Sequence, residues 1–359
     1  MTPYAINGVP PRGGALATFL LAGLLAPGPA PAADAKKPPT VEATVTLRDD
    51  AVSDQDDMCI WVHPREPSRS TIITSDKAAG KLFVYDLAGK TVQSIPAGRP
   101  GNIDLRYGFA LAGRKVDVVA FNQRKGDEVW VFAVDAATRK LLRVDNGKIE
   151  TRTNYGGTLF RSPKTSKLYF LSVCTTAEQI ELLDDGSGKV AGKTVRQWKI
   201  GYSEGAVGDD EAGMLFIAEE DGGVWAIGGE PTDPTPGRRV ARVGADGLRG
   251  DVEGLAIYHR PGGGGYLLVS NQSRDRFGVY GRRTPHRYLG SFAVRGARDT
   301  DGIDVTNVPL GRAFPRGLFA CHSGVSGGCP VLLTPWDRIA GALPTALTID
   351  TSWDPRKGK

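Results

Sequence analysis

Acidic side chains gather in five short segments of a chain that is not acidic overall. The 359 residues include 45 lysines and arginines against 40 aspartates and glutamates, which gives a net charge of +5. The five segments are 54–57, 204–205, 219–221, 251–254 and 299–304. Carboxylates that lie close together need a cation or a shared proton between them. If the segments converge in the fold, they form an oxygen-rich site suited to Ca²⁺, which takes six to eight oxygen ligands in flexible geometry.

Spacing separates the acidic groups that could bind a metal from those that build turns. Asp251 and Glu253 stand two residues apart, so in an extended strand their carboxylates point to the same side. Glu219 and Glu220 follow a strand-like run and form a second acidic pair. The Asp-Asp-Gly string at 184–186 matches no calcium-loop spacing. We expect a turn there, in which aspartate side chains bond their own backbone.

Basic residues are dispersed along the chain, and long runs of one charge sign are absent. This pattern does not indicate nucleic acid as a partner. Lys77 and Arg124 lie near acidic segments, where they could neutralise phosphate groups. Taken alone, each also fits a solvated surface charge.

Histidine and cysteine spacing disfavours a zinc site. The histidines are His63, His259, His286 and His322, and the cysteines are Cys59, Cys174, Cys321 and Cys329. Neither set contains a closely spaced ligand pair such as His-x-x-x-His or Cys-x-x-Cys. The cysteines fit disulfides in an oxidising compartment better than a metal cluster. Cys321 and Cys329 flank a glycine-rich turn and are the pair most easily joined, whereas the other two fit buried free thiols at least as well.

Two motif-like strings are rejected because of their context. Residues 324–328 satisfy Gly-x-Ser-x-Gly, but a strand-like run follows them, whereas a nucleophile elbow precedes a helix. Residues 192–194 end like a phosphate-binding loop, yet Ser187 stands where its first glycine is required. The sequence therefore indicates neither a serine hydrolase nor a nucleotide-binding protein.

The segments between these residues repeat. Glycine (47) and proline (24) are abundant, and six short strand-like runs recur at 83–85, 131–134, 180–182, 224–227, 277–280 and 331–333. Taking positions 85, 133, 181, 226, 280 and 333 as markers, the separations are 48, 48, 45, 54 and 53 residues. Such a period is typical of four-stranded propeller blades. We predict an all-β, six-bladed β-propeller; the alternative is a pair of β-sandwich domains, although no linker-like change of composition divides the chain.

The N-terminal region has the pattern of an export signal. A single arginine at position 12 precedes a twelve-residue apolar run at 15–26, which is too short to span a bilayer, and small residues follow at 30–33. We expect residues 1–33 to be a signal peptide; a disordered tail is the alternative. Residues 34–44 then form a flexible segment, 45–350 the propeller domain and 351–359 a C-terminal tail. The mature protein is expected in the periplasm or outside the cell.

Several blocks of the sequence resemble the β-propeller phytases, which are calcium-dependent 3-phytases. The blocks are 54–57, 60–64, 102–107, 217–221, 251–255, 265–270 and 299–305, and the resemblance spans residues 45–337. It implies a six-bladed propeller whose top face holds several calcium ions. That architecture agrees with the one predicted from the repeat.

The resemblance also implies roles for ten residues. The residues similar to the family's calcium-binding group at the cleavage site are Tyr155, Glu204, Glu220, Asp251 and Glu253. Those similar to further calcium-binding or water-holding positions are Asp56, Asp57 and Asp301. Those similar to the family's phosphate-binding residues are Lys77 and Arg124.

The function implied by the resemblance is release of phosphate from phytate (myo-inositol hexakisphosphate) or calcium-phytate, by water that a metal activates. A small molecule is then the partner, without nucleic acid or membrane, and a monomer is the default for a closed ring. Two other functions fit the same fold: a calcium-dependent lactonase or esterase, and a non-enzymatic extracellular binding propeller. A lysine and an arginine beside acidic segments favour an anionic phosphate ligand over both.

Overall fold

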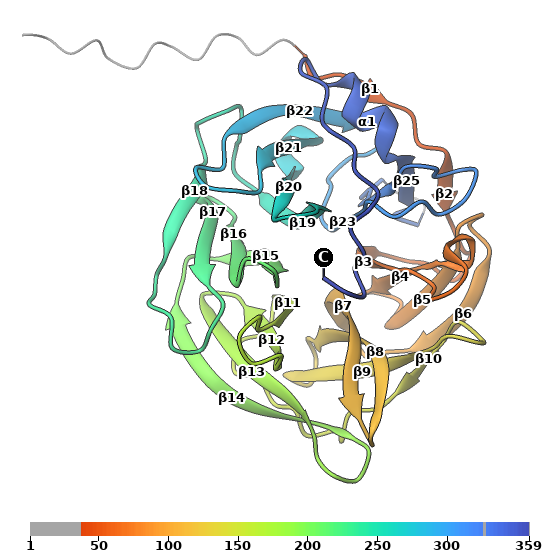
Figure 1. The fold of residues 1–359 in the computed structure, drawn as a ribbon, viewed down its shortest axis with the longest axis vertical. Coiled ribbons are helices and arrows are strands. Elements are labelled where there is room, and N and C mark those ends of the chain that lie inside the picture. The colour runs from red at the N-terminus through yellow and green to blue at the C-terminus, as the bar shows by residue number, and fades with distance from the viewer. Residues whose placement is uncertain (1–36, 326–327, 359) are drawn as a thin grey trace, which may run out of the picture. The chain divides into compact units, whose positions relative to one another are not determined.

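The chain forms a ring of six sheets around a central channel (Figure 1). The computed structural model describes residues 37–325 and 328–358. The first four sheets are β3 (Gln55–Trp61), β4 (Thr71–Asp76), β5 (Lys81–Asp86) and β6 (Thr91–Pro96); β7 (Pro100–Leu111), β8 (Arg114–Gln123), β9 (Glu128–Asp135) and β10 (Lys140–Arg143); β11 (Gly156–Arg161), β12 (Leu168–Val173), β13 (Thr176–Asp184) and β14 (Val190–Lys199); and β15 (Ser203–Asp209), β16 (Met214–Glu219), β17 (Gly223–Gly228) and β18 (Arg238–Arg242). Each is a four-stranded meander, and the prediction of a six-bladed β-propeller is confirmed.

The last two sheets include strands from the start of the described chain. They are β19 (Val252–Arg260), β20 (Gly264–Asn271), β21 (Arg276–Gly281) and β22 (Tyr288–Val294), extended by β1 (Thr40–Val41); and β23 (Ile303–Thr306), β24 (Leu318–His322) and β25 (Val331–Pro335), completed by β2 (Val45–Leu47). Because β2 is the outermost strand of the last sheet, the ring is closed by pairing of distant segments. Strand β1 falls within residues 34–44, for which the sequence indicates a flexible segment. The remaining elements are α1 (Trp336–Ala342), η1 (Pro67–Arg69) and η2 (Gln272–Arg274).

All six marker segments of the sequence repeat lie in the third strand of a sheet, in β5, β9, β13, β17, β21 and β25. These strands are apolar on both faces because each sheet packs against a neighbour on either side. In β5, Phe83 and Tyr85 enter the cluster shared with the last sheet, and Leu82 and Val84 enter the cluster shared with the second. Six such clusters, one at each interface, make up the core, so the alternative of two sandwich domains is wrong.

The innermost strands β3, β7, β11, β15, β19 and β23 line the channel, and each contacts the innermost strands of both neighbouring sheets. Glycine permits this close approach. A Cβ at Gly156 would lie 1.8 Å from the carbonyl oxygen of Glu204, and one at Gly205 would lie 2.1 Å from that of Glu253. The ring continues through Gly254, whose N–H donates to the Asp301 carbonyl at 3.1 Å.

Replacing Gly205 with alanine is therefore expected to destabilise the protein by about 3 kcal/mol, because the new methyl group meets a rigid backbone carbonyl. The melting temperature should fall by roughly 6 °C. Gly341→Ala is the matched control, since Gly341 lies in α1 and no neighbouring atom lies within 4 Å of the place that its Cβ would take. Thermal unfolding measures both variants; equal melting temperatures would contradict the close-packed ring.

The C-terminal segment covers one mouth of the channel, and the last described residues lie near the ring axis (Figure 1). Arg356 donates hydrogen bonds to the Asp117 carboxylate at 2.8 and 3.1 Å and lies over the Tyr107 ring at 4.4 Å. Trp353 stacks on His259 with ring centroids 4.1 Å apart. Tyr107 and His259 belong to the later halves of β7 and β19, so the tail lies at the mouth where the innermost strands end. The segment expected to be a tail is thus packed against the propeller.

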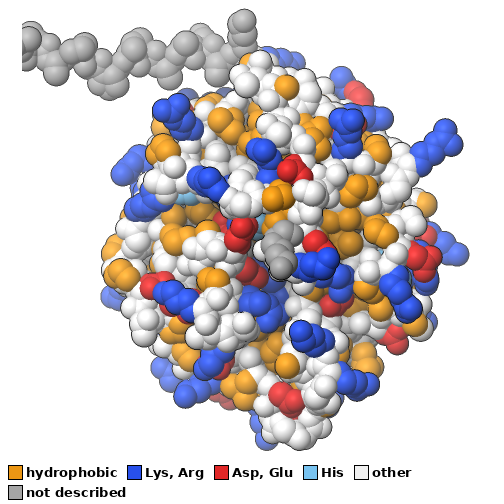
Figure 2. Space-filling model, viewed as in Figure 1, with side chains coloured by type: hydrophobic (Ala, Val, Ile, Leu, Met, Phe, Trp, Pro, Cys, Tyr) orange, Lys and Arg blue, Asp and Glu red, His pale blue; other side chains and the backbone are white. Residues whose placement is uncertain are grey.

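The surface seen in this view is mixed in charge. Figure 2 shows lysine and arginine side chains dispersed over the face, with acidic and hydrophobic side chains between them. Among the described residues, no helix has the length and apolar character needed to cross a membrane. The predicted signal peptide, residues 1–33, lies outside the described residues.

All four cysteines are free thiols in the structure. Cys59 and Cys321 are buried in the core, where burial raises the pKa of each thiol. The expected local disulfide between Cys321 and Cys329 is therefore not formed, because Cys321 belongs to the apolar cluster between the last two sheets.

Candidate functional site

The mouth where the innermost strands begin is lined by acidic and phenolic side chains. Tyr155, Glu204, Glu253 and Asp301 each directly precede one of the closely packed glycines described above or its equivalent, Gly302. The Gly302 N–H donates to the carbonyl of Asp56 at 3.0 Å, which gives Asp56 the same place in the first sheet. The propeller repeat thus brings one such residue from each of five sheets to a single mouth.

Three carboxylates meet closely at this mouth. Oxygen atoms of Glu204, Glu220 and Glu253 all lie within 4.8 Å of one another. Glu204 and Glu253 are buried, and Glu220 Oε1 is buried without a hydrogen-bond partner among the described residues. Backbone bonds position Glu220: its N–H donates to the Tyr202 carbonyl at 3.0 Å, and its carbonyl accepts from the Val252 N–H at 3.2 Å.

This arrangement disfavours ionisation of the carboxyl groups. Burial, followed by the charges of Glu204 and Asp251, raises the pKa of Glu220 to about 7. Burial and the charge of Glu204 raise the pKa of Glu253 well above its usual value. Burial and the charge of Asp56 raise the pKa of Asp301 to about 8. A divalent cation would offset both the burial of these carboxylates and their mutual repulsion, so the donor set fits calcium.

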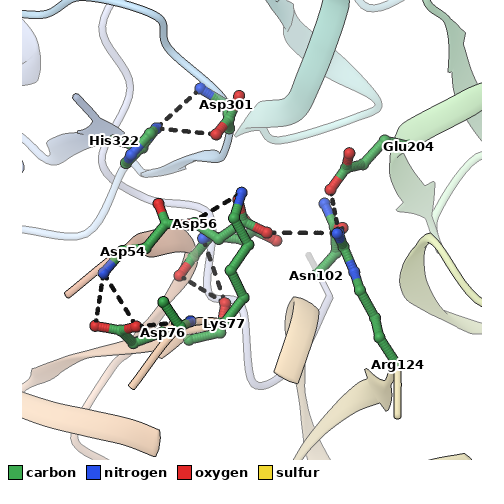
Figure 3. A network of polar contacts seen from close by, with 12 residues as sticks. Asp54, Asp56, Asp76, Lys77, Asn102, Arg124, Glu204, Asp301 and His322 are labelled. Carbon is green, nitrogen blue, oxygen red and sulfur yellow. Dashed lines mark hydrogen bonds and ion pairs between the residues drawn. The ribbon is translucent and has the colours of Figure 1, made fainter. Parts of the chain in front are cut away.

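Two basic side chains flank the acidic mouth (Figure 3). Arg124 pairs with Glu204 and lies 3.5 Å from Asp56, while Lys77 Nζ lies 2.6 Å from Asp56. Burial works against ionisation of Asp56, but the charges of Arg124 and Lys77 outweigh it and hold its pKa below the usual value. The mouth therefore combines cations and carboxylates at hydrogen-bonding distance.

A buried aspartate positions the loop that carries Lys77. Asp76 ends β4, and its carboxylate accepts hydrogen bonds from the backbone N–H groups of Ser53 (2.7 Å), Asp54 (3.1 Å) and Ala79 (2.7 Å). These bonds hold the loops on both sides of the first sheet's inner edge together. Asp76 was not among the site residues expected from the sequence.

Tyr155 joins the acidic group to the arginine. The Arg124 guanidinium lies 4.7 Å from the centroid of the Tyr155 ring, and Tyr202 stacks on the same ring at 4.9 Å. Burial and the charge of Glu204 raise the pKa of Tyr155, so its phenol stays protonated. Tyr202 is 47% exposed and forms the outer layer of this stack.

The structure separates several residues that the sequence had grouped. Asp251 has a left-handed backbone (φ 59°), precedes β19 and is exposed, so the expectation that it shares a strand face with Glu253 is wrong. Its charge nevertheless acts on Glu220. Glu219 ends β16 and bonds Trp225 Nε1 (2.5 Å) and Arg239 (2.6 Å) instead of entering the mouth.

Asp57 lies within the wall of the channel, below the mouth. Its carboxylate accepts a hydrogen bond from the Ile103 N–H at 3.0 Å, and burial raises its pKa well above the usual value. The turn expected at 184–186 is present, with Asp184 accepting from the Gly186 N–H at 2.9 Å.

Three polar residues at the mouth were not expected as site residues. Asn102 Oδ1 accepts from Arg124 at 3.4 Å, Gln272 donates to the Asp301 carboxylate, and His322 Nδ1 lies 3.3 Å from Asp301 Oδ2. Asn102 follows Gly101 at the start of β7, whereas the acidic residues of the mouth precede a glycine, so the repeat gives no signal for it. Gln272 begins η2 and His322 ends β24, and neither position carries a repeat signal.

The chain is similar to known proteins over most of its length. The family model described as Phytase matches residues 15–359. The chain belongs to the phytase family. A 3-phytase of Bacillus subtilis (strain 168) is 38% identical over an alignment of 336 residues, and the match covers 88% of this chain and 87% of the relative. All the mouth residues described above lie within the part that matches the phytase family.

Solved structures show a likeness of fold alone. A luciferin-regenerating enzyme superposes with a TM-score of 0.53 at 12% identity, covering 81% of this chain and 95% of that one. Regucalcin from Agrobacterium tumefaciens, described as a calcium-binding protein, superposes with a TM-score of 0.50 at 9% identity. The superposition covers 87% of this chain and 99% of that one.

Proposed function

We propose that this member of the phytase family is a calcium-dependent phosphomonoester hydrolase that releases phosphate from phytate. The observation that carries the proposal is the meeting of Glu204, Glu220 and Glu253 within 4.8 Å, with Arg124 paired to Glu204. A site of carboxylates alone would repel a highly charged anion. A bound metal must therefore make the net charge of the site positive before substrate enters. The 38% identity to a 3-phytase supports phytate as the substrate.

The residues present fit calcium. The side chains that would hold ions nearest the cleaved phosphate are Glu204, Glu220, Glu253, Asp251 and Tyr155, and those that would hold further ions or ordered water are Asp56, Asp57 and Asp301. Calcium bound there would supply positive charge for the phosphate oxygens and lower the pKa of a nearby water. The unpartnered Glu220 Oε1 supports this assignment, because a buried carboxylate oxygen is otherwise left unsatisfied.

The two basic residues hold and orient phosphate in this proposal. Lys77 and Arg124 pair with Asp56 and Glu204, and both can turn to phosphate oxygens when metal takes over those carboxylates. Arg124 is restrained by the Tyr155 ring and by Asn102, so its guanidinium is held at the mouth. Holding one phosphate at these side chains positions another for in-line attack by water. No seryl or histidyl phosphoenzyme is needed.

The test is the release of inorganic phosphate from phytate by the purified mature protein with calcium present. Lactone opening, measured with the same preparation, separates the lactonase or esterase alternative. Tight phytate binding with no phosphate released would instead favour a non-enzymatic propeller. Turnover of phytate with no lactone opening is the expected result.

We also propose export to the periplasm or the medium after cleavage near residue 33, and a monomeric mature protein. The support is the sequence pattern of residues 1–33 and the closed ring, which leaves short sheet edges. The proposed domain runs from 45 to 350, with strand β1 as an addition on its N-terminal side.

Calcium affinity is expected to rise as the pH is raised from about 5 to about 8. The pKa of Glu220 is raised to about 7 and that of Asp301 to about 8, chiefly by burial, so the fold favours the protonated carboxyl groups. Calcium must displace those protons. Titration calorimetry in buffers of different ionisation enthalpy measures both the affinity and the protons released; an affinity that is constant or falls with pH contradicts the assignment.

The same two groups make the calcium-free fold less stable at high pH. Their contribution to the free energy of unfolding is fully present below the unfolded pKa values, near 4, and is lost as the pH rises through about 7 and 8. Denaturant unfolding in EDTA at several pH values gives an independent measurement.

A further inference from the structure

Three side chains of different chemistry meet beside the acidic mouth. A carboxylate oxygen of Asp54, a ring nitrogen of His322 and Cys329 Sγ all lie within 4.8 Å of one another. Asp54 lies in the loop before β3, His322 ends β24, and Cys329 precedes β25. The set is distinct from the Glu204, Glu220 and Glu253 group.

His322 has one ring nitrogen free for a further ligand. The backbone N–H of Asp301 donates to Nδ1 at 3.1 Å, and Asp301 Oδ2 lies 3.3 Å from the same nitrogen. Nε2 is buried without a hydrogen-bond partner among the described residues, and the side chain is 2% exposed. An unsatisfied imidazole nitrogen in this position is costly unless a ligand completes it. Metal binding at Nε2 requires the imidazole proton to be on Nδ1, which then donates to the Asp301 carboxylate and no longer accepts from the Asp301 N–H.

Buried groups hold the backbone at the other two residues in place. The Asp76 carboxylate accepts from the Asp54 N–H at 3.1 Å. The carbonyl of Cys329 accepts from Gln55 Nε2 at 3.1 Å, and Gln55 Oε1 accepts from Thr74 at 2.7 Å. Figure 3 shows His322 lying between Asp301 and Asp54. The ligand atoms are therefore supplied by a supported scaffold, as a metal site requires.

The donor set selects the class of metal. One sulfur, one nitrogen and one oxygen suit Zn²⁺, which is bound tetrahedrally by cysteine, histidine and carboxylate and keeps water in an open fourth position. Calcium prefers oxygen ligands only. The three ligand atoms lie within 4.8 Å of one another. Movements of about 1 Å would bring them to the distances that separate ligand atoms around a zinc ion.

We propose that Asp54, His322 and Cys329 form a binding site for Zn²⁺ beside the phosphate-binding lysine. Lys77 Nζ lies 3.6 Å from Asp54 Oδ2 and 2.6 Å from Asp56 Oδ1. A metal ion bound to Asp54 would therefore compete with Lys77 for the Asp54 carboxylate. The added positive charge lies next to the mouth through which a phosphate group enters. Zinc at this site therefore tunes the substrate site without replacing its calcium.

Cobalt(II) in place of zinc provides the test, because thiolate ligation gives a charge-transfer absorption that carboxylates cannot give. Mature protein with reduced thiols is first saturated with Ca²⁺, so that the Glu204, Glu220 and Glu253 group is occupied. A single Co²⁺ is expected to bind with a thiolate charge-transfer band, and Zn²⁺ should displace it. Cys329→Ser should abolish the band, whereas the matched control Cys174→Ser, which changes a cysteine outside the set, should leave it unchanged.

A second variant keeps the proposal falsifiable if Cys329→Ser fails to fold. Asp54→Asn changes a partly exposed side chain and should weaken Zn²⁺ at least tenfold in competition with a chromophoric chelator, with calcium affinity unchanged. Three results would overturn the site: absence of the band in the wild-type protein, persistence of the band in Cys329→Ser, or a thiol count showing Cys329 in a disulfide.

Discussion

Removal of calcium is expected to lower phosphate release from phytate by about 1,000-fold, because a metal contributes several kcal/mol of transition-state stabilisation and each 1.4 kcal/mol is roughly tenfold in rate. Without the ion, Glu204, Glu220 and Glu253 repel both one another and the substrate. Arg124 then stays paired with Glu204 rather than with phosphate. The measurement is inorganic phosphate released with EDTA, and again after excess calcium is returned.

Magnesium serves as the control for metal identity. It demands near-octahedral geometry and gives up its water reluctantly, so it should restore little activity at a site built from several flexible carboxylates. Circular dichroism in EDTA shows whether the propeller stays folded during the assay. Full activity in a protein shown to be free of calcium would refute the proposed mechanism.

Glu220→Gln is expected to lower turnover by about 100-fold or more, with the fold retained. The substitution keeps the size of the side chain but removes the charge whose oxygen Oε1 is buried and unpartnered. It also removes one of three carboxylates that meet within 4.8 Å, so calcium affinity should fall as well. Steady-state kinetics on phytate and calcium titration measure the two effects.

Glu219→Gln is the matched control, because the neighbouring carboxylate bonds Trp225 and Arg239 away from the mouth. Its turnover and calcium affinity should stay within a few-fold of the wild-type values, and any loss should be of stability, about 1 kcal/mol for a partly exposed ion pair. Equal losses in both variants would remove Glu220 from the metal-binding group.

The fold was predictable because a propeller repeats a local unit. Each sheet is a meander of neighbouring strands, and its third strand is apolar on both faces. Short apolar segments therefore mark the repeat in the sequence. All six marker segments lie in those third strands. The way the ring closes was not predicted, because the pairing of β2 with β25 depends on residues at opposite ends of the described chain.

Part of the site follows from residue type and repeat position together. Glu204, Glu253 and Asp301 each precede a closely packed glycine and converge at one mouth. The direction of Asp251 was predicted wrongly, because a left-handed residue before β19 breaks the alternation on which the argument relied. Sequence spacing also could not tell Glu219 from Glu220, since the end of β16 decides which of them enters the mouth.

The amino-acid sequence by itself determined the blade period, the apolar strands and the kinds of side chain available at the strand ends, because these depend on near neighbours along the chain. Only the tertiary structure decided which of those side chains share a site. Asp54, His322 and Cys329 have no ligand spacing in the sequence, yet they meet because closure of the ring packs the last sheet against the first. The packing of apolar faces sets the distances between sheets, and a local pattern of residues does not predict these distances.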